Sequence, residues 1–267
     1  MGERSGVGAS ADVAGAASQR AAAFAIANGS PLSAARARAL TGAAPTREVL
    51  AALEAREAST APDALLDTLA ILGEQRALRS SLAESVCAAA VASQEADGGF
   101  GPGSGSTDAR LSRTGMLGGY LARSPFARPE ALDAAGDFLA RSFQPERLQS
   151  FQWQNIAGYA HYFANAPHDA SDEILQWCGR ELERGFRARA FDAVRTARVL
   201  VLCDAHAVPG AQLEASELVV ALVTEQAVDG GFGDGDREER VEETLAGLAA
   251  LRFLTGGSGL DTARGPR

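Results

Sequence analysis

The chain has 267 residues, of which 46% are hydrophobic and 22% charged, a balance typical of a globular protein that can bury a sizeable core. The net charge of −9 argues against a nucleic-acid-binding protein, because such proteins need a basic face to engage phosphates. All 25 basic residues are arginine, which we attribute to genomic base composition.

The N-terminal segment 1–12 is rich in Gly, Ser and Ala, and we expect it to be flexible. Arg20 interrupts the apolar run that follows, before this run could act as a signal peptide. No apolar stretch reaches the length of about 18 residues that a membrane-spanning helix needs. We therefore expect a cytoplasmic protein without a membrane span.

The three cysteines are odd in number and show no CxxC spacing. Cys87, Cys178 and Cys203 each fall within a helical pattern. We expect buried thiols, and neither a disulfide framework nor a metal site.

Apolar residues recur at intervals of three and four along most of the chain, whereas the alternation typical of β-strands is missing. We therefore predict an all-α protein with a single domain at 13–255 and a flexible tail at 256–267. Thr46, Pro129 and Ser171 are residue types favoured at helix starts. The helices are predicted at 11–28, 32–41, 46–57, 62–77, 80–95, 107–123, 129–142, 150–165, 170–184, 190–206, 211–226 and 239–254.

One loop sequence occurs twice. Ser-Gln-Glu-Ala-Asp-Gly-Gly-Phe-Gly at 93–101 returns as Glu-Gln-Ala-Val-Asp-Gly-Gly-Phe-Gly at 225–233. The distance from Asp97 to Asp229 divides into three units of about 44 residues, the length of a helical hairpin. The two glycines end a helix, because they tolerate the left-handed conformation found past its C-terminus. The repeated loop by itself indicates architecture and not chemistry.

The later helices pair into four hairpins, and the earlier ones supply one or two more. The second helix of each pair is the more apolar and glycine-rich, so we expect it on the inside. About five to six such hairpins form either an open α-solenoid or a closed α/α toroid, and the periodicity does not choose between these.

The repeated loops, each followed by an apolar helix, resemble the repeats of the terpenoid cyclase and protein prenyltransferase superfamily, over roughly 80–254. Two segments extend the resemblance to prenyltransferase β subunits: Gly105-Ser-Thr-Asp-Ala-Arg-Leu-Ser112 and Gly185-Phe-Arg-Ala-Arg-Ala-Phe-Asp-Ala-Val194. Glu243 stands before Thr-Leu-Ala-Gly-Leu, where the family has a zinc-binding histidine. The resemblance implies an α/α toroid whose basic residues in these segments contact a prenyl diphosphate.

The metal site that the resemblance implies is altered in this chain. Asp192 is retained, but Val194 replaces the family's cysteine and Glu243 its histidine. Because a catalytic zinc that activates a thiolate needs thiolate or imidazole ligands, we expect no zinc, although Mg²⁺ would suit a diphosphate substrate. The Asp-x-Asp-Asp acid motif of the cyclase branch is also missing, and Asp234-Gly-Asp236 is the closest sequence.

Several arginines lie near the predicted starts of inner helices, where helix dipoles favour an anion. They would either hold a diphosphate or form ordinary ion pairs with neighbouring carboxylates, namely Asp108, Asp192, Glu238, Glu242 and Glu243. The arginines are Arg110, Arg113, Arg187, Arg189, Arg195 and Arg240.

Aromatic residues cluster between 151 and 163 and would either line an isoprenoid cavity or pack in the core. The cluster comprises Phe151, Trp153, Tyr159, Tyr162 and Phe163. His161 on the same predicted helix is either a general base or a hydrogen-bonded core residue.

Two hypotheses follow. The first is a prenyltransferase-like or terpene-cyclase-like enzyme that handles an isoprenoid diphosphate, or another apolar small molecule, without zinc. The second is a non-catalytic toroid that binds a lipid or a protein partner. For the first hypothesis the catalytic candidates are Asp108, His161 and Asp192, and the substrate-binding candidates are Arg110, Arg113, Trp153, Tyr159, Arg189, Arg195 and Glu243.

Overall fold

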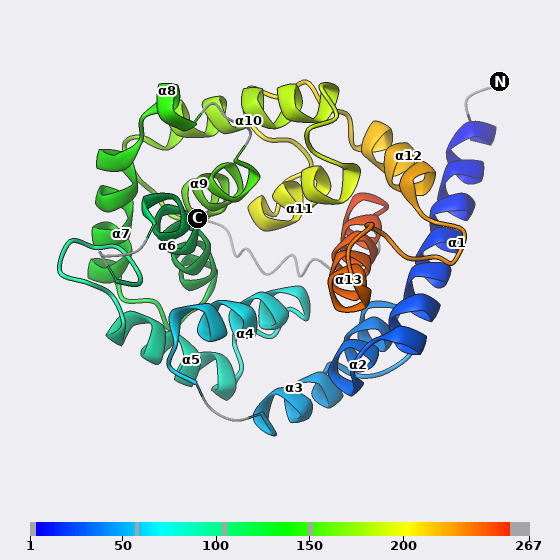
Figure 1. Cartoon of the computed structure of the whole chain (residues 1–267), viewed down its shortest axis with the longest axis horizontal. Coiled ribbons are helices and arrows are strands. Elements are labelled where there is room, and N and C mark those ends of the chain that lie inside the picture. The colour runs from blue at the N-terminus through cyan, green and yellow to red at the C-terminus, as the bar shows by residue number, and fades with distance from the viewer. Residues whose placement is uncertain (1–3, 57–58, 103–105, 149–151, 257–267) are drawn as a thin grey trace.

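The computed structural model describes residues 4–56, 59–102, 106–148 and 152–256 (Figure 1). These residues form helices and no β-strand, with one isolated antiparallel bridge between Gln94 and Phe100. The all-α prediction is thus confirmed. The helices are α1 (Arg4–Asn28), α2 (Pro31–Leu40), α3 (Thr46–Glu54), α4 (Pro62–Glu74), α5 (Ser81–Ala92), α6 (Thr107–Arg123), α7 (Pro129–Ser142), α8 (Pro145–Leu148), α9 (Trp153–Asn165), α10 (Ser171–Arg187), α11 (Ala193–Cys203), α12 (Ala215–Glu225) and α13 (Arg237–Leu254).

The predicted boundaries hold best where a cap or a proline marks the helix end. Helices α6 and α7 have the predicted bounds, whereas α11 is shorter than 190–206 because Asp192 caps it and Asp204 adopts a left-handed conformation. The short α8 was not predicted. Helix α1 starts at Arg4, so the expected flexible N-terminus is largely helical; of the expected tail, residues 257–267 lie outside the described residues.

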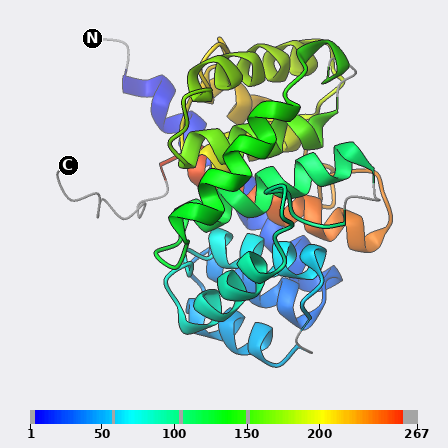
Figure 2. The ribbon, with the colours of Figure 1, turned by 90° about the vertical axis from the view of Figure 1, so that its left-hand side faces the viewer.

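The helices are arranged as a ring with two layers (Figure 1). The inner layer follows the order α4, α6, α9, α11, α13 and α2, and each of these helices packs against the next. The outer helices α3, α5, α7, α10 and α12 each contact the inner helix that precedes them in the chain. Seen from the side, α3 to α5 (blue to cyan) lie in the lower half and α10 (yellow-green) at the upper edge (Figure 2). This arrangement is compatible with the predicted α/α toroid.

The two repeated loops explain how the ring closes. The Gln94 side chain donates hydrogen bonds to the carbonyls of Gly98 and Ala131, both 2.9 Å long, and so fastens its loop to α7. The Gln226 side chain makes the same two bonds, again 2.9 Å long, to Gly230 and to Ala17 of α1. Helix α1 therefore occupies the same position beside the second loop as α7 occupies beside the first.

Two arginines on the helices that follow these loops, Arg110 on α6 and Arg240 on α13, show the same correspondence. Arg110 pairs with Asp97 of its loop and places its guanidinium 4.7 Å from the ring centre of Phe138 in α7. Arg240 pairs with Asp229 and lies 4.7 Å from the ring centre of Phe24 in α1. Helix α1 also packs against both α12 and α13 (Figure 1). The first helix thus completes the outer layer behind the last hairpin.

The loop glycines are required by geometry. Gly98 and Gly230 have φ angles of 91° and 89°, values that L-residues with a side chain rarely adopt. A Cβ atom at Gly98 would lie 2.1 Å from the carbonyl oxygen of Ala134, and one at Gly230 would lie 2.6 Å from that of Arg20. Each loop can approach its outer helix only because this Cβ is missing.

Candidate functional site

The inner helices leave a cavity of about 1280 Å³ at the centre of the ring. Its walls come from α2, α3, α4, α6, α11 and α13, with the last residue of α1. Much of the lining is alanine, whose side chain is too short to fill the space between the helices: Ala39, Ala52, Ala55, Ala70, Ala246 and Ala249. Leu40, Ile71, Val201, Leu202 and Phe253 add larger apolar surface.

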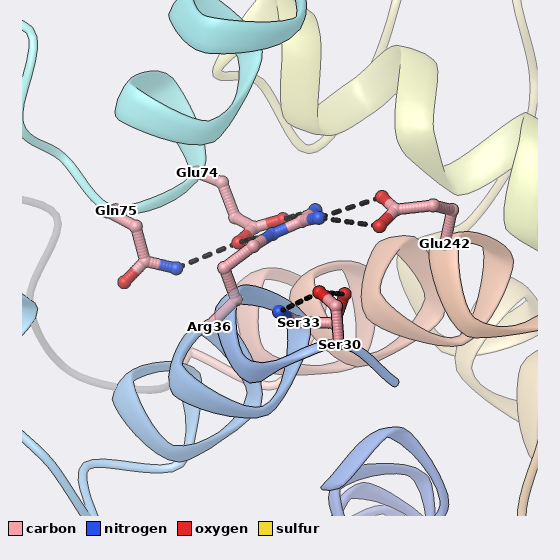
Figure 3. Close-up of polar contacts among 6 residues, drawn as sticks. All are labelled: Ser30, Ser33, Arg36, Glu74, Gln75 and Glu242. Carbon is pink, nitrogen blue, oxygen red and sulfur yellow. Dashed lines mark hydrogen bonds and ion pairs between the residues drawn. The ribbon is translucent and has the colours of Figure 1, made fainter. Parts of the chain in front are cut away.

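An ion-pair network around the buried Arg36 closes the seam between α2, α4 and α13 (Figure 3). The Arg36 guanidinium donates from Nε and Nη2 to Glu74 over 3.0 and 2.7 Å, and from Nη1 to both Glu242 oxygens over 2.8 Å. Gln75 donates to Glu74 as well, over 2.8 Å. Burial by itself would lower the pKa of Arg36, yet the charges of Glu74 and Glu242 and the hydrogen bonds to them raise it. Arg36 is thus fully engaged in holding the seam.

Two half-buried arginines on the cavity wall have no such partners. Arg123 lies in the last turn of α6, and Arg198 lies on α11. Within the part of the chain that the structure describes, neither guanidinium has a hydrogen bond or ion pair; that of Arg198 lies 5.6 Å from the centre of the Trp153 ring. The charges of both guanidiniums lower the pKa of the same two groups, Tyr120 and His161. They therefore lie close to one stretch of wall.

Asp67 on α4 faces this cavity with an exposed carboxylate. Its pKa is raised, chiefly by partial removal from water and further by Asp63 and Glu242, whereas Arg56 and Arg198 oppose the rise. The carboxylate thus lies within electrostatic reach of an unpaired arginine.

Near the starts of α11 and α13, at one rim of the ring, the structure brings together three predicted residues, Asp192, Arg195 and Glu243. Asp192 caps α11 by accepting a hydrogen bond of 2.7 Å from the Arg195 backbone. The Arg195 guanidinium lies 3.1 Å from a carboxylate oxygen of Asp192 and 3.6 Å from one of Glu243. Partial burial raises the pKa of Glu243, and Arg195 opposes the rise.

This rim cluster does not fit a zinc ion. The arginine supplies the positive charge that lies between the two carboxylates, and Val194 is buried. Across the described residues, no group of three His, Cys, Asp or Glu side chains is arranged to hold a metal.

The remaining predicted arginines are paired or lie away from the cavity. Arg110 is bound to Asp97, and Arg113 donates to Asp63 over 2.7 and 3.1 Å. Arg189 is exposed, has a φ angle of 57° and does not line the cavity. Asp108 accepts hydrogen bonds from Gln152 and Asn155 over 3.0 and 3.2 Å. Gly105 and Phe151 lie outside the described residues.

The aromatic residues of α9 pack mostly in the core. Tyr159 donates a hydrogen bond of 3.3 Å to the Leu139 carbonyl, and Tyr162 one of 2.6 Å to the Leu132 carbonyl. Burial raises the pKa of both hydroxyls. The rings of Tyr159 and Tyr162 both pack against Phe163. Trp153 instead lies beside α11 and donates a hydrogen bond of 2.8 Å to the Arg195 carbonyl.

His161 is fully buried behind Tyr120, with the two ring centres 4.4 Å apart. Neither of its ring nitrogens has a hydrogen-bond partner among the described residues. Burial lowers its pKa well below the usual range, and Arg123 and Arg198 lower it further; the nearby Met116 backbone opposes this only weakly. The imidazole is therefore neutral.

The sequence reasoning missed the residues that line the cavity, above all Arg36, Asp67, Arg123 and Arg198. One signal was present: Arg36 falls in the otherwise apolar run Ala-Ala-Arg-Ala-Arg-Ala, where a charge on the inner face requires a partner. For Arg123 and Arg198 no comparable signal exists, because the helical period does not reveal which face meets a cavity.

Comparisons with profiles of protein families, with curated proteins and with solved structures found no match. Among the described helices, none combines the length and the apolar character needed to cross a membrane.

Proposed function

We propose that the central cavity binds an isoprenoid diphosphate, or a closely similar amphipathic anion, without a catalytic zinc. One observation carries this proposal. The cavity wall includes seven arginines and five acidic residues, although the chain as a whole has a net charge of −9. A basic cavity inside an acidic protein favours an anionic ligand.

The dimensions and the lining support an apolar tail on that ligand. A volume of about 1280 Å³ exceeds the roughly 300–1,000 Å³ typical of small-molecule pockets. Alanine, leucine, valine and phenylalanine side chains form much of the wall. The sequence resemblance described above indicates the class of tail, an isoprenoid chain, and the class of reaction, its transfer or cyclisation.

A non-catalytic toroid that binds a protein partner is the second candidate. It is favoured by the ion pairs of Arg110, Arg113 and Arg195, because these family-like rim arginines are engaged with carboxylates. The two candidates differ in whether the cavity binds a small molecule.

Calorimetric titration with farnesyl and geranylgeranyl diphosphates, with product analysis of the same mixtures, tests the proposal. We expect micromolar binding of a prenyl diphosphate and weaker binding of farnesol, which lacks the charged group. Ala246→Phe should reduce binding at least tenfold by occupying the cavity, while Ala88→Phe on the exposed face of α5 should not. If neither diphosphate binds at high micromolar concentration, the protein-binding toroid becomes the better account.

A further inference from the structure

We propose that Arg123 and Arg198 form the anion-binding site of the cavity and hold the diphosphate of the ligand, in place of the arginines at the rim. This inference rests on the proposed function for the identity of the tail, but the anion site itself can be tested with inorganic diphosphate alone.

Four of the other five cavity arginines have less freedom to bind a ligand, and the fifth, Arg56, is exposed just beyond the end of α3. Arg36 is held by Glu74 and Glu242. Arg237 donates to the Asn28 carbonyl over 2.8 Å, and Arg252 donates to the carbonyls of Ala39 and Leu40 at the end of α2. Arg76 also has an interaction partner. These contacts close the ring, so a ligand that recruited these arginines would have to break structural bonds.

Arg123 and Arg198 stand in a different electrostatic position. They come from α6 and α11, which both pack against α9, and the charge of each lowers the pKa of His161 on α9. Both are half-buried on the wall of one cavity, where their like charges repel, and no carboxylate is bonded to either within the described chain. An anion that both guanidiniums reached would reduce this repulsion and would accept charge-assisted hydrogen bonds, which arginine forms well with phosphate groups.

The surroundings hold Arg198 in place. Its guanidinium lies over the Trp153 ring, and the Trp153 indole is in turn bonded to the backbone of α11. Such stacking restricts the arginine side chain before a ligand arrives and so reduces the entropy lost on binding. It also makes Trp153 a fluorescent reporter of events at Arg198.

The wall next to this site is suited to an apolar tail. Val201 and Leu202 follow Arg198 by about one helical turn on α11, and all three line the cavity. Ala249 and Phe253 on α13 continue the apolar surface. A diphosphate bound by Arg198 would therefore place its tail along α11 and α13.

The test is calorimetric titration with inorganic diphosphate at fixed ionic strength, followed also by Trp153 fluorescence. We expect Arg123→Ala and Arg198→Ala each to weaken binding about tenfold, and the double variant to abolish it. Arg180→Ala removes the same charge from an exposed site on the outer helix α10 and should change the affinity less than twofold. Arg198→Lys keeps a cation and most of the stem, so it should lose less affinity; it also replaces the alanine variant if that does not fold.

The outcomes separate the site from the function. Unchanged binding of inorganic diphosphate by both alanine variants, with the wild type binding well, would overturn the site. If these variants bind farnesyl diphosphate as the wild type does, the site is wrong although the isoprenoid function stands. If the variants lose inorganic diphosphate but the farnesyl tail adds no affinity in the wild type, the site stands and the isoprenoid function falls.

Discussion

At the scale of single residues, burial and partners decide what a titratable group does. His161 and Asp67 illustrate the two extremes. His161 is fully buried without a hydrogen-bond partner in the described part of the chain, so it stays neutral, whereas Asp67 faces an open cavity beside basic groups. Neither environment can be recognised from the residue types alone.

His161→Leu should change how stability depends on pH. The folded-state pKa of His161 is lowered well below 6.5, so the unfolded chain binds this proton more readily. Stability that is fully present above the unfolded pKa is therefore lost as the pH falls below it, by up to about 1.4 kcal/mol per pH unit. Urea unfolding at several pH values should show this loss in the wild type and a smaller one in His161→Leu. Parallel profiles for the two proteins would contradict this account.

Asp67 should make anion binding in the cavity depend on pH. Its pKa is raised, mainly by burial, so it becomes protonated at a higher pH than an ordinary aspartate as the pH falls. The neutral form no longer opposes an anion near Arg198, and binding should then strengthen severalfold. Sulfate is a suitable probe, because its own charge stays constant in this range. Asp67→Asn should bind more tightly at neutral pH and show a flatter profile; an unchanged profile would count against this role.

Arg195 should exclude zinc from the rim cluster. It contacts both Asp192 and Glu243, and no cysteine or histidine among the described residues completes a metal-binding set. We expect purified protein to carry well below one equivalent of zinc by elemental analysis. A stoichiometric zinc whose chelation removes activity would show that Asp192 and Glu243 bind zinc despite Arg195.

At the scale of helices and loops, the same contact serves two purposes at different places in the ring. Gln94 joins consecutive hairpins, whereas the matching contact of Gln226 joins the last hairpin to α1. Losing the second contact weakens the attachment of α1 to the last hairpin, which packing against α13 also maintains, whereas losing the first leaves this attachment unchanged.

Gln226→Ala should therefore destabilise the protein by about 1–3 kcal/mol, because it leaves the Ala17 and Gly230 carbonyls without this donor. Gln94→Ala loses the two equivalent bonds and should cost the same or slightly less, because Gln226 also accepts hydrogen bonds from the exposed Arg20. Hydrogen exchange should separate the two, with α1 losing protection only in Gln226→Ala. Equal protection of α1 in both variants would argue against its role in closing the ring.

The contact between α6 and α9 depends on glycine. A Cβ atom at Gly115 would lie 2.3 Å from the carbonyl oxygen of Gly158, so Gly115→Ala must push the two helices apart. We expect a loss of roughly 1–3 kcal/mol, typical of overpacking. Gly15→Ala is the control, because this helical glycine has nothing within 4 Å of its missing Cβ. Thermal unfolding should show the control stabilised by about 0.5–1 kcal/mol, since alanine favours the helix; no difference between the variants would refute the argument.

At the scale of the whole molecule, the central cavity is left open by the ring of inner helices and their small side chains. Filling it with a ligand should stabilise the ring, because only the folded state binds. At a hundred times its Kd, farnesyl diphosphate should add about 2.7 kcal/mol and raise the Tm by several degrees. Differential scanning fluorimetry would measure this rise, and it should be smaller in Ala246→Phe, whose cavity is partly filled.

The helices could be predicted well from the sequence because their signals are local. The apolar period, the cap at Asp192 and the prolines at 62 and 129 act within one or two turns, and α6 and α7 have the predicted bounds. The repeated Asp-Gly-Gly-Phe-Gly loops likewise indicate a structural role, and in the structure Gln94 and Gln226 fasten them to α7 and α1.

The candidate site was harder to predict, because it depends on side chains that meet across the ring. The sequence by itself determined most of the helices and the repeat of the Asp-Gly-Gly-Phe-Gly loop. Only the tertiary structure decided that Arg195 is paired, that Arg123 and Arg198 have no ion pair with any described residue, and that α1 completes the ring. The reason is physical: helix formation depends on neighbours within a few residues, whereas the pairing of a charge depends on groups that folding brings together from distant parts of the chain.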